Sequence, residues 1–564
     1  MSVTTRTALV EQTATKRGWR ARLTESWINF LADCGSPLNL AVVRIFVFAA
    51  IPFSRDFQEA TKYASFPREL IVPPMGMSWL PIAAIDPSIV AWAQSFLVVS
   101  CVCAVLGWRT KISTLVATIL SVYVLAMPQM LGKTNHNNLV LIWFAWVLSA
   151  SRCADVLSVD AAIRGWRAAR PNMHVLQEQS IVYGLPMKIL FLTMGLVYFF
   201  PGYWKLHTCG LDWASADHMR LQLWSQWHGT HSQHWRADKL PWLCSLMGWG
   251  TIAFENLFSF VVLFPFGRVL LLAIGPLFHA GIAAIMRIYF YALIGAYVTL
   301  VDWQKVCNWL SPRLFKQRLT IHYSSSDQLS RHVLGAIKSI DLFGAMVCEE
   351  QEGLEHSPGA VVAGNAVFGT DVYKSALKTT IIGWLFLPFL HQIVERQVAR
   401  GGIAEDRSKT QATPDKPVVS DWRSLITVAV AAAILFAGNV YMGFRGTSNG
   451  WPFACFPRFD AMPDSEVNEL KIEAFDANGK SLKVPRPQSV FGASQWHSVW
   501  YRAFSKKTEN GDVILTAIWN CLAERDPSLT AAQSVKYIIE KYDTDPDTVS
   551  KEPLASEVVF EFRP

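Results

Sequence analysis

The sequence predicts an α-helical multi-pass membrane protein with about nine transmembrane helices, a small cytoplasmic α/β insertion and an external α+β domain at its C-terminus. Of the 564 residues, 51% are hydrophobic, 12% aromatic and only 17% charged, which is more apolar than a soluble protein usually is. Apolar stretches long enough, or nearly long enough, to cross a bilayer recur along the chain. Basic residues gather between these stretches, so the net charge of +7 needs no nucleic-acid partner to explain it.

Residues 1–37 form a basic N-terminal segment. The segment has neither the apolar core nor the small-residue cleavage site of a signal peptide, so we expect it to stay in the cytoplasm. Arginines alternate with tryptophans and other apolar residues over 16–31, a pattern typical of an interfacial helix.

Nine apolar segments define the predicted membrane map. With the basic N-terminus inside, residues 304–421 are expected in the cytoplasm and 444–564 outside, in a bacterial inner membrane. The segments cover 38–53, 89–108, 112–131, 138–152, 184–201, 249–266, 268–285, 286–302 and 422–443.

The ten cysteines offer two candidate disulfides. Cys209 and Cys244 share one predicted external loop, and Cys455 and Cys521 share the predicted external domain, where an oxidising compartment permits pairing. The alternative is that all ten are free thiols, because pairing cannot be deduced from sequence.

Four ionisable residues lie within or beside predicted spans, where charge is costly and often functional: Arg44, Lys205, Glu255 and His279. Arg44 and Glu255 could also form a structural pair that holds helices together, and His279 could be a packing residue. The corresponding structural explanation for Lys205 is an anchor that extends to the headgroups.

A functional interpretation of Lys205 rests on the preceding Pro201 and Gly202. This dipeptide is expected to break the helix and leave Lys205 on irregular backbone, which a membrane protein tolerates only beside protein or a water-lined cavity. A lysine in such a desolvated pocket can act as a base.

The loop after Lys205 is rich in histidine and tryptophan. His228, His231 and His234 recur every three residues and would share one face of a helix, where they could bind a metal. The carboxylate or cysteine of a standard catalytic zinc site is missing, so an interfacial aromatic belt is favoured and no metal is expected. The sequence also has no zinc-finger spacing, Walker loop or dinucleotide fingerprint.

Several segments resemble the vitamin K-dependent gamma-carboxylase family, also called the horizontally transferred transmembrane (HTTM) domain family. The segments are "PLNLAVVRIFVF", "GKTNHNNLVLIWFAWVLSASRCADVLSVDA", "LVYFFPGYWKLHTCGLDWASAD" and "FHAGIAAIMRIYFYALIGAYVTL". The resemblance covers roughly residues 20–305 and defines a predicted transmembrane domain over 38–303.

This resemblance implies a quinone-dependent lyase chemistry. A lysine base, here Lys205, deprotonates a reduced quinone of the vitamin K or menaquinone type, and oxygen converts the quinone to an epoxide. The strong base so formed removes a γ-proton from glutamate in a peptide or protein on the external side, and carbon dioxide adds. A γ-proton is far too weak an acid for a side chain alone, so oxidation must generate the base in a water-excluded pocket.

The resemblance also implies a set of site residues. Lys205 and His136 are the expected catalytic residues, and the expected quinone-binding residues are Asn137, Asn138, Arg44, Glu255 and His279. The chain departs from the family motif at Leu139, where the family has a histidine directly after Asn-Asn. His136 lies three residues earlier, on the same face of an expected helix, and could substitute.

Residues 304–400 contain the predicted cytoplasmic insertion, with strands at 318–323 and 359–364, a helix at 328–343 and helices from Asp371. "HYSSSDQLSRHVLGAIKSIDLFG" resembles a DCC-type thiol-disulfide oxidoreductase domain, which implies a thioredoxin-like fold. Its Cys-x-x-Cys is absent, since the aligned positions are Tyr323, Ser324, Ser325, Asp327 and Ser330. Without thiols it cannot perform dithiol exchange, so we expect a degenerate binding or scaffold domain.

A polar linker over 401–421 leads to the last span, 422–443, and to the external domain, 444–564. In this domain we predict a hairpin turning at Asp476–Gly479, a tryptophan-rich helix over 494–523, and strands over 535–542 and 556–562.

Two classes of function remain open at this stage. The first, which is our leading hypothesis, is a quinone-dependent carboxylase, with the lipid bilayer and a peptide substrate as partners. The second is a non-catalytic membrane scaffold that binds lipid or quinone, or a maturation or export factor for a partner polypeptide. The missing family histidine and the missing thiols favour the second class.

Overall fold

The computed structural model describes residues 19–135, 137–171, 178–230, 235–316, 318–354, 357–362, 365–380, 421–446, 449–453, 459–504, 510–548 and 552–564. His136, His231, His234 and Cys455 lie outside these ranges, as does nearly all of the predicted 401–421 linker. Most of the described chain is helical, and two small sheets complete it.

Within the described residues, six helical segments are long and apolar enough to cross a membrane. They contain α3 (Pro37–Ala50) with α4 (Arg55–Ala64), α5 (Pro87–Leu106), α6 (Thr110–Val124), α9 (Ile181–Cys209), α12 (Pro265–Met286) and α18 (Trp422–Arg445). The other predicted spans correspond to two shorter apolar helical stretches, α7 (Leu139–Ala150) and α13 (Tyr291–Ala296) with its 3-10 extension to Leu300, and to α11 (Pro241–Val261). The total of nine membrane crossings therefore stays a prediction.

Local sequence explains where these helices begin and end. The carboxylate of Asp86 accepts hydrogen bonds from the amides of Ser88 and Ile89, and Pro87 follows at the first helical position of α5. Gly107 ends the helix with φ of 70°, a left-handed conformation that glycine adopts without a steric penalty. The basic N-terminal segment likewise has a helix, α2 (Trp19–Ala32), which exposes Trp27 and Ile28.

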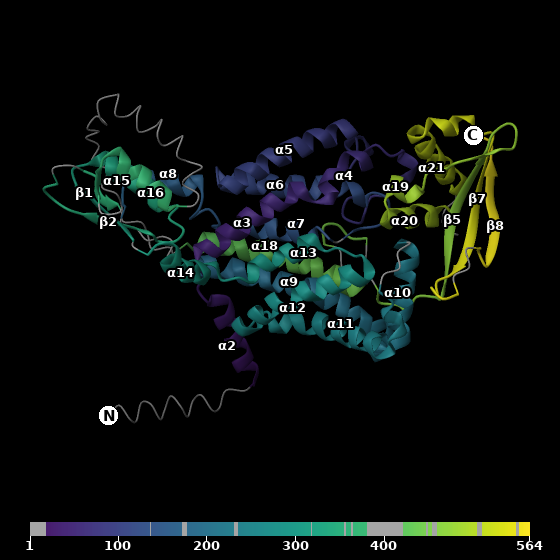
Figure 1. The fold of residues 1–564 in the computed structure, drawn as a ribbon, viewed down its shortest axis with the longest axis horizontal. Helices are drawn as coiled ribbons and strands as arrows, with labels where there is room; N and C mark the ends of the chain where they lie inside the picture. The colour runs from purple at the N-terminus through teal and green to yellow at the C-terminus, as the bar shows by residue number, and fades with distance from the viewer. Residues whose placement is uncertain are drawn as a thin grey trace.

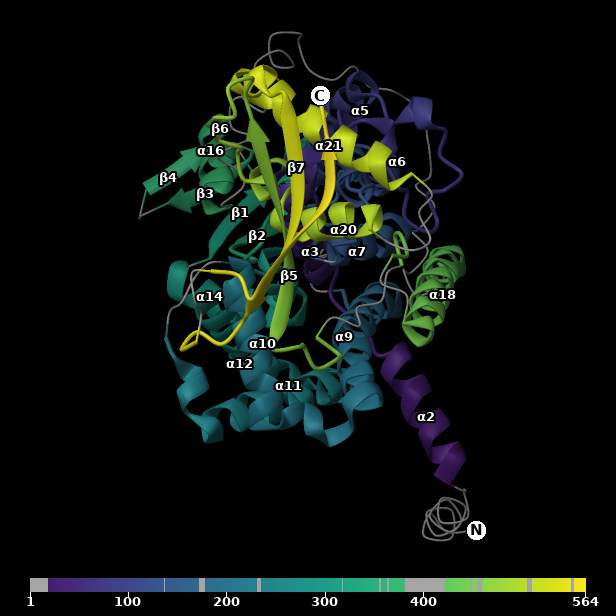
Figure 2. The same ribbon diagram turned by 90° about the vertical axis from the view of Figure 1, so that its right-hand side faces the viewer.

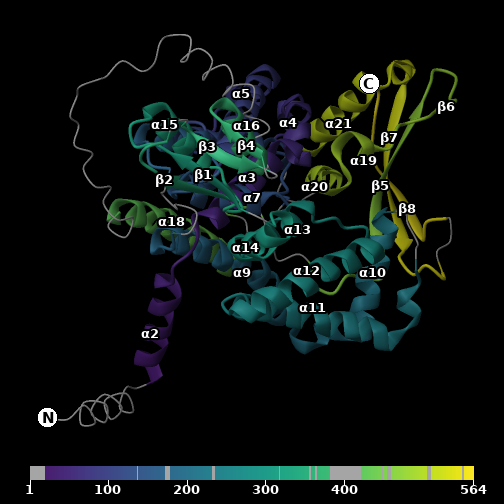
Figure 3. The ribbon, with the colours of Figure 1, turned by 60° about the vertical axis from the view of Figure 1, so that its left-hand side comes forward.

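The two small sheets lie at opposite ends of the helical bundle (Figures 1 and 3). The first belongs to the α/β unit, whose strands have the order β2-β1-β3-β4, with β1 parallel to β2 and the other pairs antiparallel. This unit contains β1 (Leu319–Tyr323), α15 (Gln328–Lys338), β2 (Met346–Glu350), β3 (Gly359–Val362), β4 (Asn365–Phe368) and α16 (Thr370–Thr379). β2 and β4 are additions to the predicted elements.

Two glycines allow the α/β unit to pack closely on the bundle. A Cβ atom at Gly165 of α8 (Val159–Ala168) would lie 2.3 Å from the carbonyl oxygen of Gly335 in α15. A side chain at either position would force the helices apart, so the backbones of α8 and α15 are in direct contact. Helix α14 (Trp303–Leu314) leads from the bundle into the unit.

The second sheet belongs to the C-terminal domain and is antiparallel, with strand order β6-β5-β7-β8. Figure 2 faces this domain and shows β5, β7 and β8 side by side. Its elements are β5 (Glu466–Phe475), β6 (Ser481–Leu482), α19 (Pro487–Phe491), α20 (Ala493–Ala503), α21 (Gly511–Arg525), β7 (Ser534–Asp543) and β8 (Ala555–Phe562). The predicted helix over 494–523 is thus two helices, and the predicted turn contains Gly479 with φ of 74°.

Hydrogen bonds join the C-terminal domain to the loops at its end of the bundle. The Tyr63 hydroxyl donates to the Phe491 carbonyl at 2.9 Å, and the Gln495 amide donates to the Pro128 carbonyl at 2.6 Å. Arg502 donates to the Leu70 carbonyl at 2.8 Å. Because these donors are largely buried, the domain is packed on the bundle rather than tethered by a flexible linker.

The structure does not form the candidate Cys209–Cys244 disulfide. Both residues are free thiols. The Cys209 sulfur lies near the backbone carbonyl of Asp460, and the Cys244 sulfur lies near that of Ala237. Cys521 is also a free thiol, and its candidate partner lies outside the described residues.

Candidate functional site

Close packing of α9 on α11 builds the centre of the site. Gly195 and Gly202 lie seven residues apart on α9 and both face α11. The Ser259 hydroxyl donates to the Gly195 carbonyl at 2.8 Å, and a Cβ atom at Gly202 would lie 2.6 Å from the side-chain nitrogen of Asn256. Small residues of this kind let membrane helices approach closely, and here they bring Glu255 of α11 toward α9.

Lys205 and Glu255 form a buried ion pair. The lysine Nζ lies 2.9 and 2.6 Å from the two carboxylate oxygens, and the side chains are 4% and 12% exposed. The same ammonium lies 5.1 Å from the centre of the Trp213 ring, within the range of a cation–π interaction. A buried charge is tolerated only with such a partner, so each residue of the pair accounts for the other.

The predicted helix break before Lys205 is wrong. Helix α9 continues through Pro201 and Gly202 to Cys209, so Lys205 lies on a regular helix. Proline is tolerated inside membrane helices because neighbouring groups satisfy the backbone that it leaves unpaired. The dipeptide therefore permits close helix packing rather than ending the helix.

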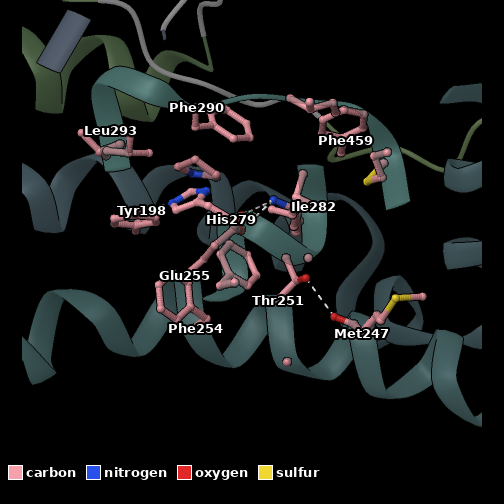
Figure 4. Close-up of a pocket in the computed structure, with 18 of the residues that line it drawn as sticks. Tyr198, Met247, Thr251, Phe254, Glu255, His279, Ile282, Phe290, Leu293 and Phe459 are labelled. Carbon is pink, nitrogen blue, oxygen red and sulfur yellow. Dashed lines mark hydrogen bonds and ion pairs between the residues drawn. The ribbon is translucent and has the colours of Figure 1, made fainter. Parts of the chain in front are cut away.

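The ion pair lies in the wall of a cavity of about 520 Å³. Most of the lining is apolar and aromatic, and it comes from α7, α9, α10 (Ala216–Thr230), α11, α12 and the segment that follows α12. Figure 4 shows Met247, Thr251 and Phe254 rising from one helix toward Ile282 and His279. A cavity of this size with few polar groups is typical of a site for a small apolar ligand.

A second polar group in the cavity wall is His279 of α12. Its Nε2 lies 2.8 Å from the Tyr198 hydroxyl, which in turn lies 2.8 Å from the Tyr297 hydroxyl. The ring is 3% exposed, and its other nitrogen, Nδ1, is buried without a hydrogen-bond partner among the described residues. The Tyr198 hydroxyl therefore fixes the position of the imidazole in the cavity wall.

A strap, which we define as the described residues 449–453 and 459–463, crosses the cavity on the side of the C-terminal domain. The Trp143 indole donates to the Pro452 carbonyl at 2.7 Å, and the Trp213 indole donates to the Phe459 carbonyl at 2.5 Å. Gln222 donates to the Ala461 carbonyl at 2.9 Å. Phe459 itself lines the cavity (Figure 4), so the strap forms part of its wall.

The predicted site residues just before α7 do not all face the cavity. Asn137 lines the cavity, with its side chain 3.5 Å from the Tyr289 carbonyl oxygen, whereas Asn138 points away and hydrogen-bonds Asp56. His136 lies outside the described residues. Leu139, which stands where the family motif has histidine, is 1% exposed and lines the same cavity as Lys205.

Arg44 lies apart from the described cavity lining. It is fully buried and donates to the carbonyls of Cys153, Leu157 and Val105 at 2.7, 2.5 and 3.4 Å. These carbonyls belong to the ends of neighbouring helices and loops, so Arg44 joins them structurally. The alternative Arg44–Glu255 pair is wrong, because Glu255 is bound to Lys205.

The histidine-rich loop connects to the C-terminal domain. His228 Nε2 lies 3.0 Å from a carboxylate oxygen of Glu469 in β5, and the other two histidines of the row lie outside the described residues. In the part of the chain that the structure describes, there is no group of three or more histidine, cysteine, aspartate or glutamate side chains that could hold a metal.

In the α/β unit, Asp327 and Ser330 lie three residues apart, which is the spacing of the Cys-x-x-Cys motif that this sequence lacks. The Ser330 hydroxyl lies 2.8 Å from the Tyr373 hydroxyl, and Ser324 is hydrogen-bonded to Ser326 at 2.8 Å. Cys348, on β2, is buried, and burial raises the pKa of its thiol to about 12. A thiol with so high a pKa is a poor nucleophile at neutral pH, so this cysteine does not replace the missing pair.

Two site residues, Tyr198 and Trp213, were not predicted from the sequence. Tyr198 lies seven residues before Lys205, which places both on one face of a helix, so helical periodicity could have found it. Trp213 lies beyond the end of α9, and nothing in the local pattern indicates that its ring packs against Lys205.

The helical bundle, its membrane-length apolar helices and the ion pair in an apolar cavity are those of a polytopic membrane protein with a buried polar pair in its core. The family model described as "HTTM domain" matches residues 36–306, which include the helices that line the cavity except α18. The chain is therefore similar to HTTM proteins over this region, and an HTTM-type membrane protein is the class that the match supports. No curated protein and no solved structure matches the chain.

Proposed function

We propose that this protein is a membrane enzyme that binds a reduced quinone in the cavity and removes its hydroxyl proton with the Lys205–Glu255 pair. The observation that carries the proposal is a buried ammonium–carboxylate pair in the wall of an otherwise apolar cavity. Groups of this kind within membrane helices are functional by default, because their burial costs free energy.

The cavity fits a reduced quinone. A quinone is a flat apolar ring with an oxygen at each of two opposite edges, so it needs apolar walls and two polar contacts. Lys205 and Tyr198, the partner of His279, lie seven residues apart on α9, which is about 10 Å along the helix axis. One ring oxygen would then meet Lys205 while the other lies toward the Tyr198–His279 pair.

The ion pair supplies a base by internal proton transfer. The Lys205 Nζ lies 2.6 Å from one Glu255 oxygen, which is within hydrogen-bonding distance. If the carboxylate takes one ammonium proton, Lys205 becomes a neutral amine that can accept the hydroxyl proton of the quinone.

We extend the proposal to carboxylation of glutamate in a peptide or protein. A bound reduced quinone supplies, with oxygen, an oxidation that yields the quinone epoxide and water and that makes a base strong enough for the γ-proton of glutamate, after which carbon dioxide adds to the carbanion. The protein's own contributions are to orient the ring, to exclude water with its aromatic walls, and to hold the proton at the ion pair. The substrate peptide would approach from the strap, on the side of the C-terminal domain.

The proposal includes an orientation in the membrane. The α/β unit, a degenerate DCC-like domain without the two thiols, faces the cytoplasm together with the N-terminus, and the C-terminal domain lies outside a bacterial inner membrane. The positions of the two units at opposite ends of the bundle support opposite sides of the bilayer (Figure 1).

Quinone epoxide formation tests the proposal. Purified protein in nanodiscs, given reduced menaquinone and oxygen, should form epoxide, and Lys205→Ala should abolish it. Lys188→Ala is a matched control, since Lys188 lies on the same helix in an ion pair with Asp33 and outside the cavity lining. Loss of activity in both variants, or in neither, would refute a specific role for Lys205.

A second candidate function is a quinone-binding or lipid-binding scaffold without chemistry, or a maturation or export factor. The observation that favours it is Leu139, an apolar side chain in the cavity wall where the family motif has histidine. This candidate predicts that the wild-type protein binds the quinone but forms no epoxide with oxygen.

A further inference from the structure

The wall of the cavity formed by α12 is also part of the outer surface of the protein. Ile274 and Leu277 both line the cavity, and their exposed fractions are 43% and 71%. In the most apolar stretch of α12 only 17% of the residues are buried, compared with 72% in that of α9, which also lines the cavity. The cavity is therefore open along α12 and closed along α9.

The facing helix contributes a second edge of this opening. On α11, Gly250 lines the cavity and is itself exposed, and on α12, Gly281 lines it and is half-buried. A Cβ atom at either glycine would meet no other atom within 4 Å. Empty space therefore lies next to α11 and α12 at this cavity, at the positions of the two glycines.

The opening lies at the depth of the hydrocarbon layer. Helix α12 has 22 residues, which is about 33 Å of helix and close to the thickness of the bilayer core. Leu277 is near its middle, so the opening faces lipid rather than water. Its lining at Ile274, Leu277 and Ile282 is apolar, which suits the passage of hydrocarbon and disfavours that of a polar ligand.

We propose that the cavity opens sideways between α11 and α12 into the bilayer, and that the tail of a lipid-soluble quinone leaves the protein through this opening while its ring stays in the cavity. This inference rests on the proposed function, because it takes the ligand to be a quinone, and it specifies a long-tailed, membrane-dissolved one. We refer to the edge formed by Gly250, Ile274, Leu277 and Gly281 as the α11–α12 opening.

A comparison of two quinones in glycine variants tests the α11–α12 opening. Quenching of tryptophan fluorescence, with Trp143 and Trp213 in the cavity wall, measures binding to the full chain in detergent micelles. The probes are menadione, which has no tail, and a menaquinone with a tetraprenyl tail. Gly250→Leu and Gly281→Leu should weaken binding of the tailed quinone by at least about tenfold and that of menadione by less than about threefold.

Gly229→Leu is the matched control. Gly229 lies on α10, a Cβ atom there would also meet nothing within 4 Å, and the residue is not part of the described cavity lining. This variant should bind both quinones as the wild-type protein does. Elution volume and thermal unfolding midpoint identify any variant that fails to fold, and the two leucine variants lie on different helices, so each tests the opening independently.

Three results would overturn the inference. Equal losses for both quinones in the leucine variants would mean that leucine fills the ring site, and no loss for either would mean that the tail takes another route. In both cases wild-type binding of the quinones would leave the proposed function standing. If the wild-type protein bound neither quinone, the proposed function would fail together with the opening.

Discussion

Removal of one partner of the Lys205–Glu255 pair should destabilise the protein much more than removal of both. At the observed 2.6 Å the Coulomb attraction is about 6 kcal/mol for an effective dielectric constant of about 20, and desolvation of the two charges offsets most of it. Lys205→Met or Glu255→Leu alone leaves an uncompensated buried charge, at a cost of about 3–5 kcal/mol each. The double variant leaves no charge and should be close to wild type in stability.

The Lys188–Asp33 pair provides the comparison. Lys188 lies on the same helix α9, 2.5 Å from the carboxylate of Asp33, which follows the end of α2, but the Asp33 side chain is 60% exposed to solvent. Water and salt screen such a pair, so its coupling free energy should be below about 1 kcal/mol, against about 3 kcal/mol or more for Lys205–Glu255. The same double-variant design applies to both pairs.

Unfolding of the purified variants in mixed detergent micelles, followed by tryptophan fluorescence against denaturant, measures both coupling free energies. A double variant Lys205→Met/Glu255→Leu that is destabilised by the sum of the two single costs would show that the two residues are not energetically coupled. Equal coupling free energies for the Lys205–Glu255 and Lys188–Asp33 pairs would show that burial does not strengthen the interaction.

Three further predictions concern two contacts of the site and one ion pair outside the cavity lining. Gly202→Ala should lower the free energy of unfolding by about 1–3 kcal/mol, because its Cβ would press on α11, whereas Gly281→Ala should not lower it, and denaturant titration compares them. Trp213→Phe should lose the hydrogen bond to the strap, at about 1 kcal/mol, and should increase hydrogen exchange of strap amides. A hydrogen bond from Arg236 holds the pKa of Asp547 below its ordinary value, so the stability it contributes is present above about pH 4 and is lost as the pH falls through the lowered pKa. Thermal unfolding between about pH 7 and pH 3 should therefore show a smaller loss of stability for Asp547→Asn than for the wild-type protein.

Most helices and strands could be predicted from the pattern of apolar residues and from local turn signals. Each predicted span corresponds to a helix, because a long apolar segment without charge has few other stable forms in a bilayer. The strands of the C-terminal domain at 535–542 and 556–562 were likewise readable, since they alternate and are rich in β-branched and aromatic residues. The short strands β2 and β4, with five and four residues, have too little pattern to be distinguished from loop.

The partners within the site could not be predicted in the same way. Lys205 and Glu255 were each identifiable as costly charges, but they are 50 residues apart in sequence and only the packing of α9 on α11 brings them together. Arg44 was the partner considered for Glu255 from the sequence, and it is instead enclosed by carbonyls. The glycines that decide this packing act through the absence of a side chain, and sequence alone does not tell which helix approaches them.

Photolabelling tests whether the cavity binds a quinone. An azido-substituted menaquinone irradiated with the wild-type protein, followed by digestion and mass spectrometry, identifies the residues next to the ring. We expect label on cavity residues such as Met247, Phe254 or Ile282, and loss of that label when unmodified menaquinone is present in excess. Label confined to residues outside the cavity, or label that excess menaquinone does not displace, would contradict the proposal that this cavity is a quinone site.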